Sequence, residues 1–277
     1  MRVIKNSFIT DTVAELCKKA AYNLPQDIIK SLKSAKNSET NLAKEIIKLT
    51  LENAKTASKG VYPLCQDTGT AVLFVEIGQQ VQIAGSLEKA LQDGIKKGFK
   101  ENYLRKSIVS EPLFKRENTK TNTPAIIHYK IVTGDKLKIN LMLKGGGAEN
   151  KSQIKMFNPT ASKEEIIDFI LNVVKTAGAS ACPPFVVGIG LGGNFETAPL
   201  LAKQALLRNK PNKNLNYKKL EQEILTKINK TNIGPQGFGG KTTALKVFIE
   251  YAPCHIASLP CAVNICCHSS RHAEVIL

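Results

Sequence analysis

Apolar residues recur at helical spacing through most of the first sixty residues. The chain begins with a short run that predicts a strand, and we expect a helix to begin at Thr10 or Asp11. Its repeating apolar positions are Ala14, Leu16, Cys17, Ala20 and Ala21. Two further helices are expected over residues 27–34 and 40–58, the latter ending at Gly60. The N-terminal segment is therefore predicted to be helical.

Strands are predicted where apolar residues alternate or run without interruption. The expected strands cover residues 71–78, 185–193, 243–251 and 262–265. Residues 125–143 form two β-rich runs around Gly134–Asp135, which predicts a hairpin. Further helices are expected over residues 87–99, after Gly85–Ser86, and over residues 162–177, 195–208 and 215–229. Ser162 and Glu165 have the spacing of a capping box.

The order of these elements predicts the fold class. Helices and strands mix without strict alternation, and no internal repeat or low-complexity tail interrupts them. We therefore expect an α/β fold of the mixed α+β type, with Gly-rich loops at strand ends. A length of 277 residues and an apolar fraction of 43% suit a single globular domain covering residues 1–277.

The net charge and the aromatic content limit the kinds of binding partner that are expected. The formal net charge is +16, which suits anionic partners such as a small dicarboxylate or an acidic subunit. Aromatic residues make up only 6% and tryptophan is absent, so bases would find few stacking platforms and nucleic acid is not expected. No apolar run approaches the roughly 20 residues that span a bilayer. The start lacks a signal-peptide pattern, so no membrane association and a cytoplasmic location are expected.

Seven cysteines raise the question of which ones perform chemistry. They are Cys17, Cys65, Cys182, Cys254, Cys261, Cys266 and Cys267. Without a signal peptide, cysteines are more often metal ligands, catalytic groups or buried thiols than disulfides. A zinc site is one alternative, since three cysteines and His268 crowd near the C-terminus. No C-x-x-C pair occurs, however, and structural zinc sites usually contain one.

Four segments are rich in glycine, proline, cysteine and polar residues and lie next to apolar strands. They are PLCQDTGT (63–70), KGGGAEN (144–150), CPPFVVGIGLGGN (182–194) and residues 232–272. Glycine-rich turns at strand ends let the backbone approach a ligand and present N–H groups to it. Functional residues are expected in these loops.

Two segments of the sequence come close to phosphate-binding motifs but do not match them. Residues 188–193 contain G-x-G-x-x-G, but the acidic residue expected about 20 positions later is missing from residues 211–214. Residues 234–243 resemble a P-loop, but Pro235 occupies the place of its first glycine. Neither segment predicts nucleotide binding.

Taken together, the segments resemble a known enzyme family. PLCQDTG, KGGGAEN, CPPFVVGIGLGG, IGPQGFGGKTT and HIASLPCAVNICCHSSR are similar to motifs of class I fumarate hydratases and L-tartrate dehydratases, in the family order. The similarity covers roughly residues 40–272. It implies a hydro-lyase whose amino-terminal part binds a [4Fe–4S] cluster.

The resemblance implies three cluster ligands, at Cys65, Cys182 and Cys267. Thiolates are the ligands that iron–sulfur clusters require, and with no fourth protein ligand one iron keeps an open coordination position. An open iron can polarise the hydroxyl and carboxylate of a bound 2-hydroxy dicarboxylate. His268 and Arg271 adjoin the third ligand and are expected to tune the cluster.

The doublet Cys266–Cys267 offers two candidates for the third ligand. The family motif places its ligand directly before a histidine or tryptophan, which favours Cys267. The remaining cysteines have no counterpart in the motifs and are expected to be ordinary buried thiols: Cys17, Cys254 and Cys261.

Other site residues follow from the same resemblance. Gln66 and Asp67 are expected near the cluster, with Asp67 supporting proton transfer. Arg105, in a helix-like stretch, is expected to clamp a substrate carboxylate. His255 is expected to bind substrate or relay a proton. Backbone N–H groups that could hold a carboxylate come from Gly145, Gly146 and Gly147. Each of these residues also has a purely structural alternative. Asp67 could cap its loop, Arg105 could be solvated, His255 could be structural, and residues 145–147 could form a plain tight turn.

The chain lacks any counterpart of the second domain found in single-chain members of the family. The resemblance therefore implies an alpha subunit, completed by a separate beta subunit, with α₂β₂ as the expected assembly. The expected reaction is reversible hydration of fumarate to (S)-malate, with L(+)-tartrate dehydration as the alternative. A basic, non-enzymatic metalloprotein that binds nucleic acid is the competing class.

Overall fold

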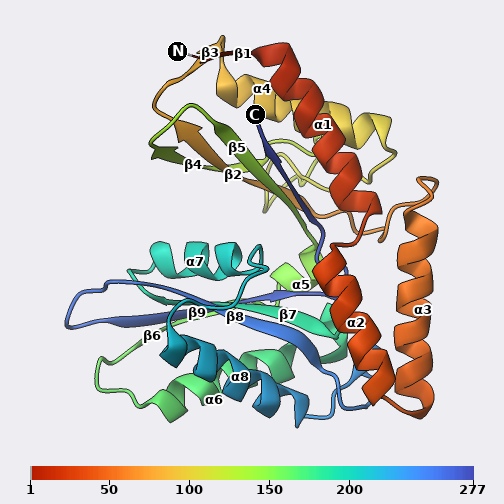
Figure 1. Cartoon of the computed structure of the whole chain (residues 1–277), viewed down its shortest axis with the longest axis vertical. Helices are drawn as coiled ribbons and strands as arrows, with labels where there is room; N and C mark the ends of the chain where they lie inside the picture. Colours follow the sequence, from red (N-terminus) through yellow and green to blue (C-terminus); the bar gives the residue numbers. More distant parts are fainter. Residues whose placement is uncertain (1) are drawn as a thin grey trace. The chain divides into compact units, whose positions relative to one another are not determined.

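The computed structural model describes residues 2–277, and these divide into two compact units (Figure 1). Within the described residues, unit 1 comprises residues 2–25, Asn53–Gly146 and Arg271–Leu277, and unit 2 comprises Gln26–Glu52 and Gly147–Ser270. The mixed α/β class is confirmed. The expectation of one functional domain over the whole chain stays a prediction. None of the helices formed by residues 2–277 is both long and apolar enough to cross a bilayer.

Unit 1 is built on a four-stranded sheet with two helices packed against it. In sheet order the strands are β10 (His272–Ile276), β5 (Leu137–Lys144), β2 (Thr70–Gly78) and β4 (Ile126–Val132). Helices α1 (Asn6–Tyr22) and α4 (Leu87–Glu101) lie side by side against this sheet (Figure 1). Strands β1 (Arg2–Lys5) and β3 (Val81–Ala84) form a separate parallel pair. The core of this unit is continuous across α1, α4, β2 and β5.

The hairpin predicted for residues 125–143 is wrong in its pairing. Both strands form, as β4 and β5, but β2 lies between them, parallel to β4 and antiparallel to β5. The reason lies in β2, whose residues Ala71–Val75 are all buried. A strand with both faces apolar is stable in the centre of a sheet, and a local turn signal does not reveal an insertion from elsewhere in the chain.

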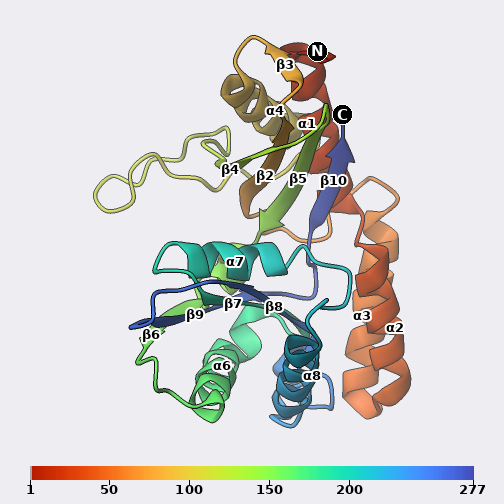
Figure 2. The ribbon, with the colours of Figure 1, turned by 60° about the vertical axis from the view of Figure 1, so that its left-hand side comes forward.

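Unit 2 is a second four-stranded sheet with helices on both faces (Figure 2). In sheet order the strands are β6 (Gln153–Phe157), β9 (Leu259–Cys266), β7 (Phe185–Gly192) and β8 (Ala244–Ala252). Helix α7 (Thr197–Ala205) covers one face, while α6 (Lys163–Ala177) and α8 (Leu215–Asn229) cover the other. The shorter elements are α5 (Gly146–Glu149), η1 (Gly178–Ala181) and η2 (Pro235–Gly237).

The N-terminal helical pair is anchored to unit 2 by two polar contacts. Helix α2 (Gln26–Ser38) precedes α3 (Asn41–Ala57), most of which belongs to the same unit. Asp27 pairs with Lys246 of β8, and the Glu39 carboxylate accepts the backbone N–H of Thr242 at 2.5 Å. These contacts tie α2 and the turn that follows it to β8 and the segment before it.

The glycines of the G-x-G-x-x-G segment serve helix packing. A Cβ at Gly190 would lie 2.0 Å from the carbonyl oxygen of Ala198, and one at Gly188 would lie 2.1 Å from that of Ala202. Both carbonyls belong to α7, which therefore rests directly on the backbone of β7. The sequence signal is thus explained by close approach of helix and strand.

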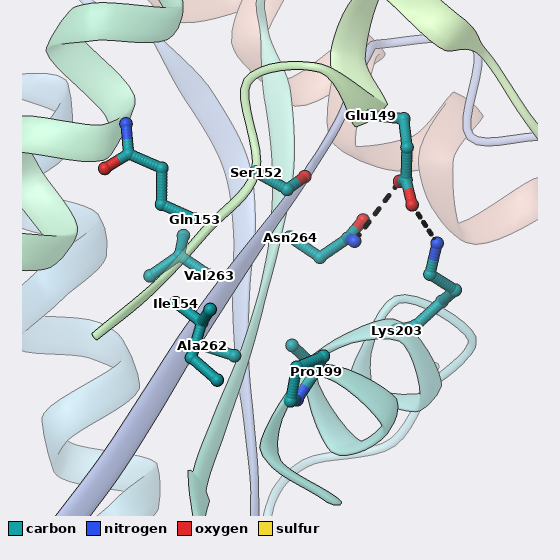
Figure 3. A pocket seen from close by; sticks show the side chains of 10 residues that line it. Glu149, Ser152, Gln153, Ile154, Pro199, Lys203, Ala262, Val263 and Asn264 are labelled. Carbon is teal, nitrogen blue, oxygen red and sulfur yellow. Dashed lines mark hydrogen bonds and ion pairs between the residues drawn. The ribbon is translucent and has the colours of Figure 1, made fainter. Parts of the chain in front are cut away.

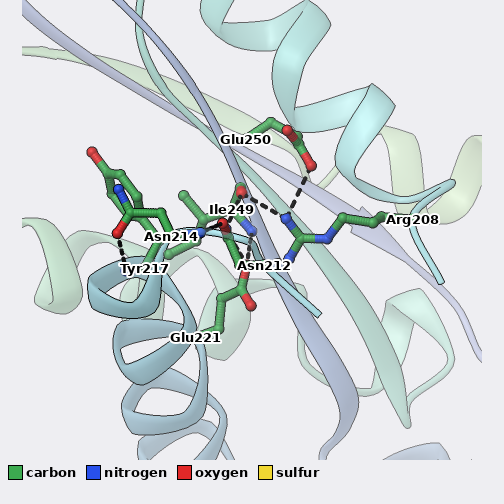
Figure 4. Close-up of polar contacts among 7 residues, drawn as sticks. All are labelled: Arg208, Asn212, Asn214, Tyr217, Glu221, Ile249 and Glu250. Atoms are coloured by element: carbon green, nitrogen blue, oxygen red, sulfur yellow. Dashed lines mark hydrogen bonds and ion pairs between the residues drawn. The ribbon is translucent and has the colours of Figure 1, made fainter. Parts of the chain in front are cut away.

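The loop at residues 209–214 is fixed by a polar network rather than by apolar packing (Figure 4). Arg208 donates to Glu250 at 3.0 Å and pairs with the largely buried carboxylate of Glu221. That carboxylate also accepts the N–H of Ile249 at 2.8 Å and the amide of Asn212 at 3.0 Å. The loop is thereby tied to both α8 and β8.

Element boundaries agree with the sequence patterns in most places. The helix over 215–229 and the Ser162–Glu165 capping box are confirmed. Helix α1 begins at Asn6, earlier than expected, and α7 is shorter than residues 195–208. Three short strands were not predicted at all: β3, β6 and β10.

Candidate active site

The PLCQDTG loop leads into β2 and is fixed at its base. Leu64 is buried, its N–H donates to Ala21 O at 2.8 Å, and its carbonyl accepts from the Asn53 side chain at 2.9 Å. Cys65 follows directly and is half-buried, while Gln66 is exposed. The thiol is therefore presented at the surface of unit 1 by an anchored backbone.

Asp67 is held against the glycine loop of the KGGGAEN motif. Its Oδ1 accepts the N–H of Gly69 at 3.1 Å, and its Oδ2 accepts the N–H of Gly146 at 2.8 Å. Gly69 has φ +75°, and a Cβ there would lie 2.3 Å from Lys144 O. Of the glycine N–H groups expected to hold a substrate carboxylate, that of Gly146 thus holds a carboxylate of the chain itself.

Arg105 lies outside any helix, contrary to expectation, because α4 ends at Glu101. Its side chain is exposed, and its carbonyl accepts the hydroxyl of Thr68 at 2.5 Å. This contact places Arg105 beside the loop that carries Asp67. Two of the residues expected to contact substrate are thereby brought together in unit 1.

Arg271 belongs with Asp67 in unit 1. Only 3% of its surface is exposed, and its Nη2 is 3.4 Å from the place where a Cβ of Gly145 would be. Asp67 Oδ2 is 3.1 Å from the same point. Among the residues that the structure describes, Arg271 Nη1 is buried without a hydrogen-bond partner. A buried guanidinium with spare donors suits a carboxylate ligand.

Cys182 and Cys267 come together at one end of the unit 2 sheet. Cys182 follows η1 with a left-handed backbone, φ 55° and ψ 66°, and its carbonyl accepts the N–H of His268 at 3.3 Å. Cys182 is exposed and Cys267 is half-buried. Two of the three expected ligands therefore lie on neighbouring backbone segments.

Gln236 joins these two segments and was missed by sequence reasoning. Its backbone N–H and its side-chain Nε2 both donate to Pro183 O, at 2.8 and 2.9 Å. The same Nε2 lies 3.0 Å from His268 Nδ1. The only signal for this role was the position of Gln236 inside the IGPQGFGG motif.

The remaining cysteines differ in how deeply they are buried. Burial raises the pKa of Cys261 to about 12 and also raises the pKa of Cys17, so neither thiol ionises readily. Cys266 is the last residue of β9 and is buried, whereas Cys267 stands just beyond the strand. Cys254, expected to be buried, is exposed because it lies in the loop between β8 and β9.

His255 lies at the opposite end of the unit 2 sheet from Cys182 and Cys267. It occupies the exposed loop before β9, while Cys267 follows the last residue of that strand. Eight extended residues at about 3.4 Å each separate the strand's ends by roughly 24 Å. His255 Nδ1 accepts the N–H of Ala257 at 3.1 Å, within its own loop. The structure does not bring His255 to these cysteines within one chain.

Glu149 of the KGGGAEN motif lines a cavity of about 260 Å³ beside α7 (Figure 3). It pairs with Lys203 of α7 and accepts from the Asn264 side chain of β9 at 3.2 Å. The motif's acidic residue is therefore a link between α5, α7 and β9. Across residues 2–277, no group of three or more histidine, cysteine, aspartate or glutamate side chains is arranged to hold a metal ion.

Comparison with known proteins gives a consistent result. A profile of fumarate hydratase (Fumerase) matches residues 10–276. A protein of Methanocaldococcus jannaschii, provisionally named L(+)-tartrate dehydratase subunit alpha, is 40% identical over 275 residues, covering 96% of each chain. L(+)-tartrate dehydratase subunit alpha of Escherichia coli strain UTI89 is 30% identical over 274 residues, covering 96% of this chain and 90% of its own. The corresponding protein of Escherichia coli O157:H7 is 29% identical over 276 residues, covering 97% and 90%.

These similarities define the class of protein, which is a hydro-lyase enzyme. The chain belongs to the fumarate hydratase (Fumerase) family of iron–sulfur hydro-lyases and corresponds to the alpha subunit. The family and the subunit expected from the ordered motifs are confirmed.

Proposed function

We propose that this chain is the cluster-binding alpha subunit of a hydratase that interconverts fumarate and (S)-malate. The observation that supports this most directly is the joining of Cys182 to the Cys267–His268 segment at one end of a sheet. The family match supports the reaction class.

The proposed ligands of a [4Fe–4S] cluster are Cys65, Cys182 and Cys267. Their chemistry fits the group, since thiols that are exposed or half-buried in anchored loops are accessible to iron. Cys17 and Cys261 do not fit, because burial raises their pKa. When bound, the cluster would supply a Lewis-acidic iron with an open position that polarises the hydroxyl of the substrate.

The chain's own residues would bind and orient the dicarboxylate. Arg105 and Arg271 are both associated with the Asp67 loop, and a guanidinium can hold a carboxylate through two parallel hydrogen bonds. Asp67 Oδ2 would hold or move a proton near the reacting carbons, with its position set by Gly146. Gln66 and the N–H groups of Gly145 and Gly147 complete the proposed substrate contacts.

We place His255 in the site of a second copy of this chain. Its loop lies roughly 24 Å along β9 from Cys267, so a role at the cluster requires another chain to supply it. The same end of unit 2 exposes large apolar side chains: Met156, Phe195, Tyr251 and Ile256. An apolar end surface suits contact between copies, as an α₂β₂ assembly would require.

A separate beta subunit would complete the enzyme. The relatives are named as alpha subunits, and the chain spans at least 90% of their length. The proposed partner would supply the remaining catalytic groups of the hydro-lyase. A cytoplasmic location stays a prediction.

L(+)-tartrate is the second candidate substrate. The observation in its favour is that the similar proteins of Methanocaldococcus and Escherichia carry the name of L(+)-tartrate dehydratase. Tartrate is a dicarboxylate with one more hydroxyl than malate, so the same carboxylate contacts would serve both.

Activity assays of the reconstituted complex would separate the two substrates. The chain is co-expressed with its second subunit, loaded with iron and sulfide without oxygen, and supplied with fumarate, (S)-malate or L(+)-tartrate. The proposal predicts the highest kcat/KM with fumarate and (S)-malate. A preference for L(+)-tartrate would change the proposed substrate but not the proposed reaction class. No activity on any of the three compounds would contradict the proposal.

A further inference from the structure

An arm extends outward from unit 1 between α4 and β4 (Figure 2). It covers residues 105–122, between α4 and β4, and forms neither helix nor strand. Its two sides pair through an isolated bridge between Val109 and Asn118. Ser110 N–H donates to Glu117 O at 2.8 Å, which closes the tip. The arm is thus a defined structure with no hydrophobic core of its own.

The tip of the arm is organised by one carboxylate. Glu111 accepts the backbone N–H groups of Leu113 at 2.5 Å, Phe114 at 2.6 Å and Lys115 at 2.8 Å. These bonds, that from Leu113 foremost, lower the pKa of Glu111. The Arg116 guanidinium donates to Pro112 O. The conformation of the tip is therefore fixed before any partner binds, which reduces the entropy lost on binding.

This fixed tip presents two large apolar side chains to solvent. Leu113 is 72% exposed and Phe114 is 85% exposed. Lys115 and Arg116 follow them directly and are exposed as well. An aromatic and an aliphatic side chain held outward beside two cations have the composition of a binding anchor. A tip that contacted only solvent would not need a fixed conformation with exposed apolar side chains.

We propose that this arm inserts into the second subunit of the hydro-lyase. Leu113 and Phe114 would fill an apolar pocket there, and acidic residues at the rim would pair with Lys115 and Arg116. Charge argues against a second copy of this chain as the occupant, because each copy carries +16 and the arm over residues 105–122 carries five cations against two carboxylates. This inference rests on the proposed two-subunit enzyme.

The base of the arm connects docking to the substrate loop. Asn122 is fully buried, accepts the N–H of Ser107 at 2.8 Å and donates to Gly69 O at 3.1 Å. On the other side, the carbonyl of Arg105 accepts the Thr68 hydroxyl. Both ends of the arm are thus bonded to the segment that follows Asp67. Docking of the tip would hold Arg105 and this loop in place.

The test compares arm variants in binding to the second subunit. Leu113→Ser/Phe114→Ser removes the apolar anchor, and Lys115→Glu/Arg116→Glu reverses the charge. Phe8→Ser is the matched control, since Phe8 is an aromatic residue of the same unit that is 55% exposed on α1. The dissociation constant is measured with purified second subunit at low and moderate salt. Iron per chain is measured on each variant alone.

Both arm variants should bind the second subunit at least tenfold more weakly, while Phe8→Ser binds as the unmodified chain does. Iron content of the isolated chain should be unchanged in all three. Unaltered affinity of the arm variants, or an equal loss with Phe8→Ser, would overturn the docking role and leave the proposed hydratase intact. If the unmodified chain bound no iron, this result would instead contradict the proposed function and would leave the docking role intact.

Discussion

Cys182 shows how the backbone of a single residue is held by its neighbours. A left-handed conformation costs on the order of 1 kcal/mol for a residue with a Cβ, yet Cys182 adopts it at φ 55°. The backbone there is held by Cys182 N–H donating to Ala179 O at 3.1 Å and by the contact from His268. The surrounding bonds keep the thiol exposed beside the segment that carries Cys267.

The first prediction concerns the cysteines. Cys65→Ser, Cys182→Ser and Cys267→Ser should each reduce iron binding severalfold or more and abolish hydration activity, because serine is a poor ligand for an iron–sulfur cluster. The matched controls are Cys17→Ser and Cys261→Ser, two buried positions at which iron content should be kept. Iron and sulfide analysis of the anaerobically loaded chain decides between the two groups. Equal iron loss in the controls and the ligand variants would contradict the assignment.

The second prediction concerns Gln236. Gln236→Ala removes the side-chain bond to Pro183 O and the contact with His268, which should cost about 1 kcal/mol of stability. The loop of Cys182 should then move more freely, and the cluster should be lost faster on exposure to a chelator. Gln222→Ala, on the exposed face of α8, is the control. Identical rates of iron release would show that Gln236 has no role in positioning the ligands.

The motifs predicted most of these residues, and the structure shows which of them lie together. Asp67 and Arg105 were expected near substrate, and both lie around one loop in unit 1. Arg271 is expected to tune the cluster because it adjoins Cys267 in sequence, and the structure shows its guanidinium beside Gly145 and Asp67. Neighbours in sequence can belong to different units, and a motif does not show where the chain changes unit.

At the scale of elements, amphipathic helices were predictable and strand pairing was not. Long helices show their periodicity locally, and Ser162 shows its cap within four residues. The strands missed were β3, β6 and β10, each of only four or five residues. The position of β2 between β4 and β5 depends on contacts between distant segments, which no local pattern contains.

The third prediction tests the packing of α7 on β7. Gly190→Ala places a Cβ 2.0 Å from Ala198 O, so the helix must shift, at a cost of about 1–3 kcal/mol. Thermal unfolding should show a clearly lower Tm. Gly134→Ala is the comparison, because no atom lies within 4 Å of its Cβ and only its φ of +105° opposes the change. A smaller effect at Gly190 than at Gly134 would refute the packing explanation.

At the scale of the whole molecule, each compact unit is assembled from segments that are distant in sequence. Unit 1 combines three segments and unit 2 combines two. Cys65 belongs to unit 1, whereas Cys182 and Cys267 belong to unit 2. The proposed role of His255 at the cluster adds a requirement for a second chain.

The fourth prediction tests that requirement by mixing two inactive variants. Cys182→Ser lacks a cluster ligand, and His255→Gln lacks the histidine, so each alone should be nearly inactive. In mixed assemblies, a site with intact cysteines can receive His255 from the other chain, and random pairing should restore roughly a quarter of full activity. Hydration assays after co-expression measure the recovery. A mixture that stays inactive would contradict supply of His255 by the second copy.

The most direct measurement of the central claim is the iron and acid-labile sulfide content of the full chain, loaded without oxygen, together with its absorption spectrum. The account predicts about four irons and four sulfides per chain and broad absorption near 400 nm, as thiolate-bound clusters show. It also predicts that the loaded chain gains fumarate hydration activity when the second subunit is added. A chain that binds no iron, or takes up stoichiometric zinc in its place, would contradict the assignment of Cys65, Cys182 and Cys267 as cluster ligands.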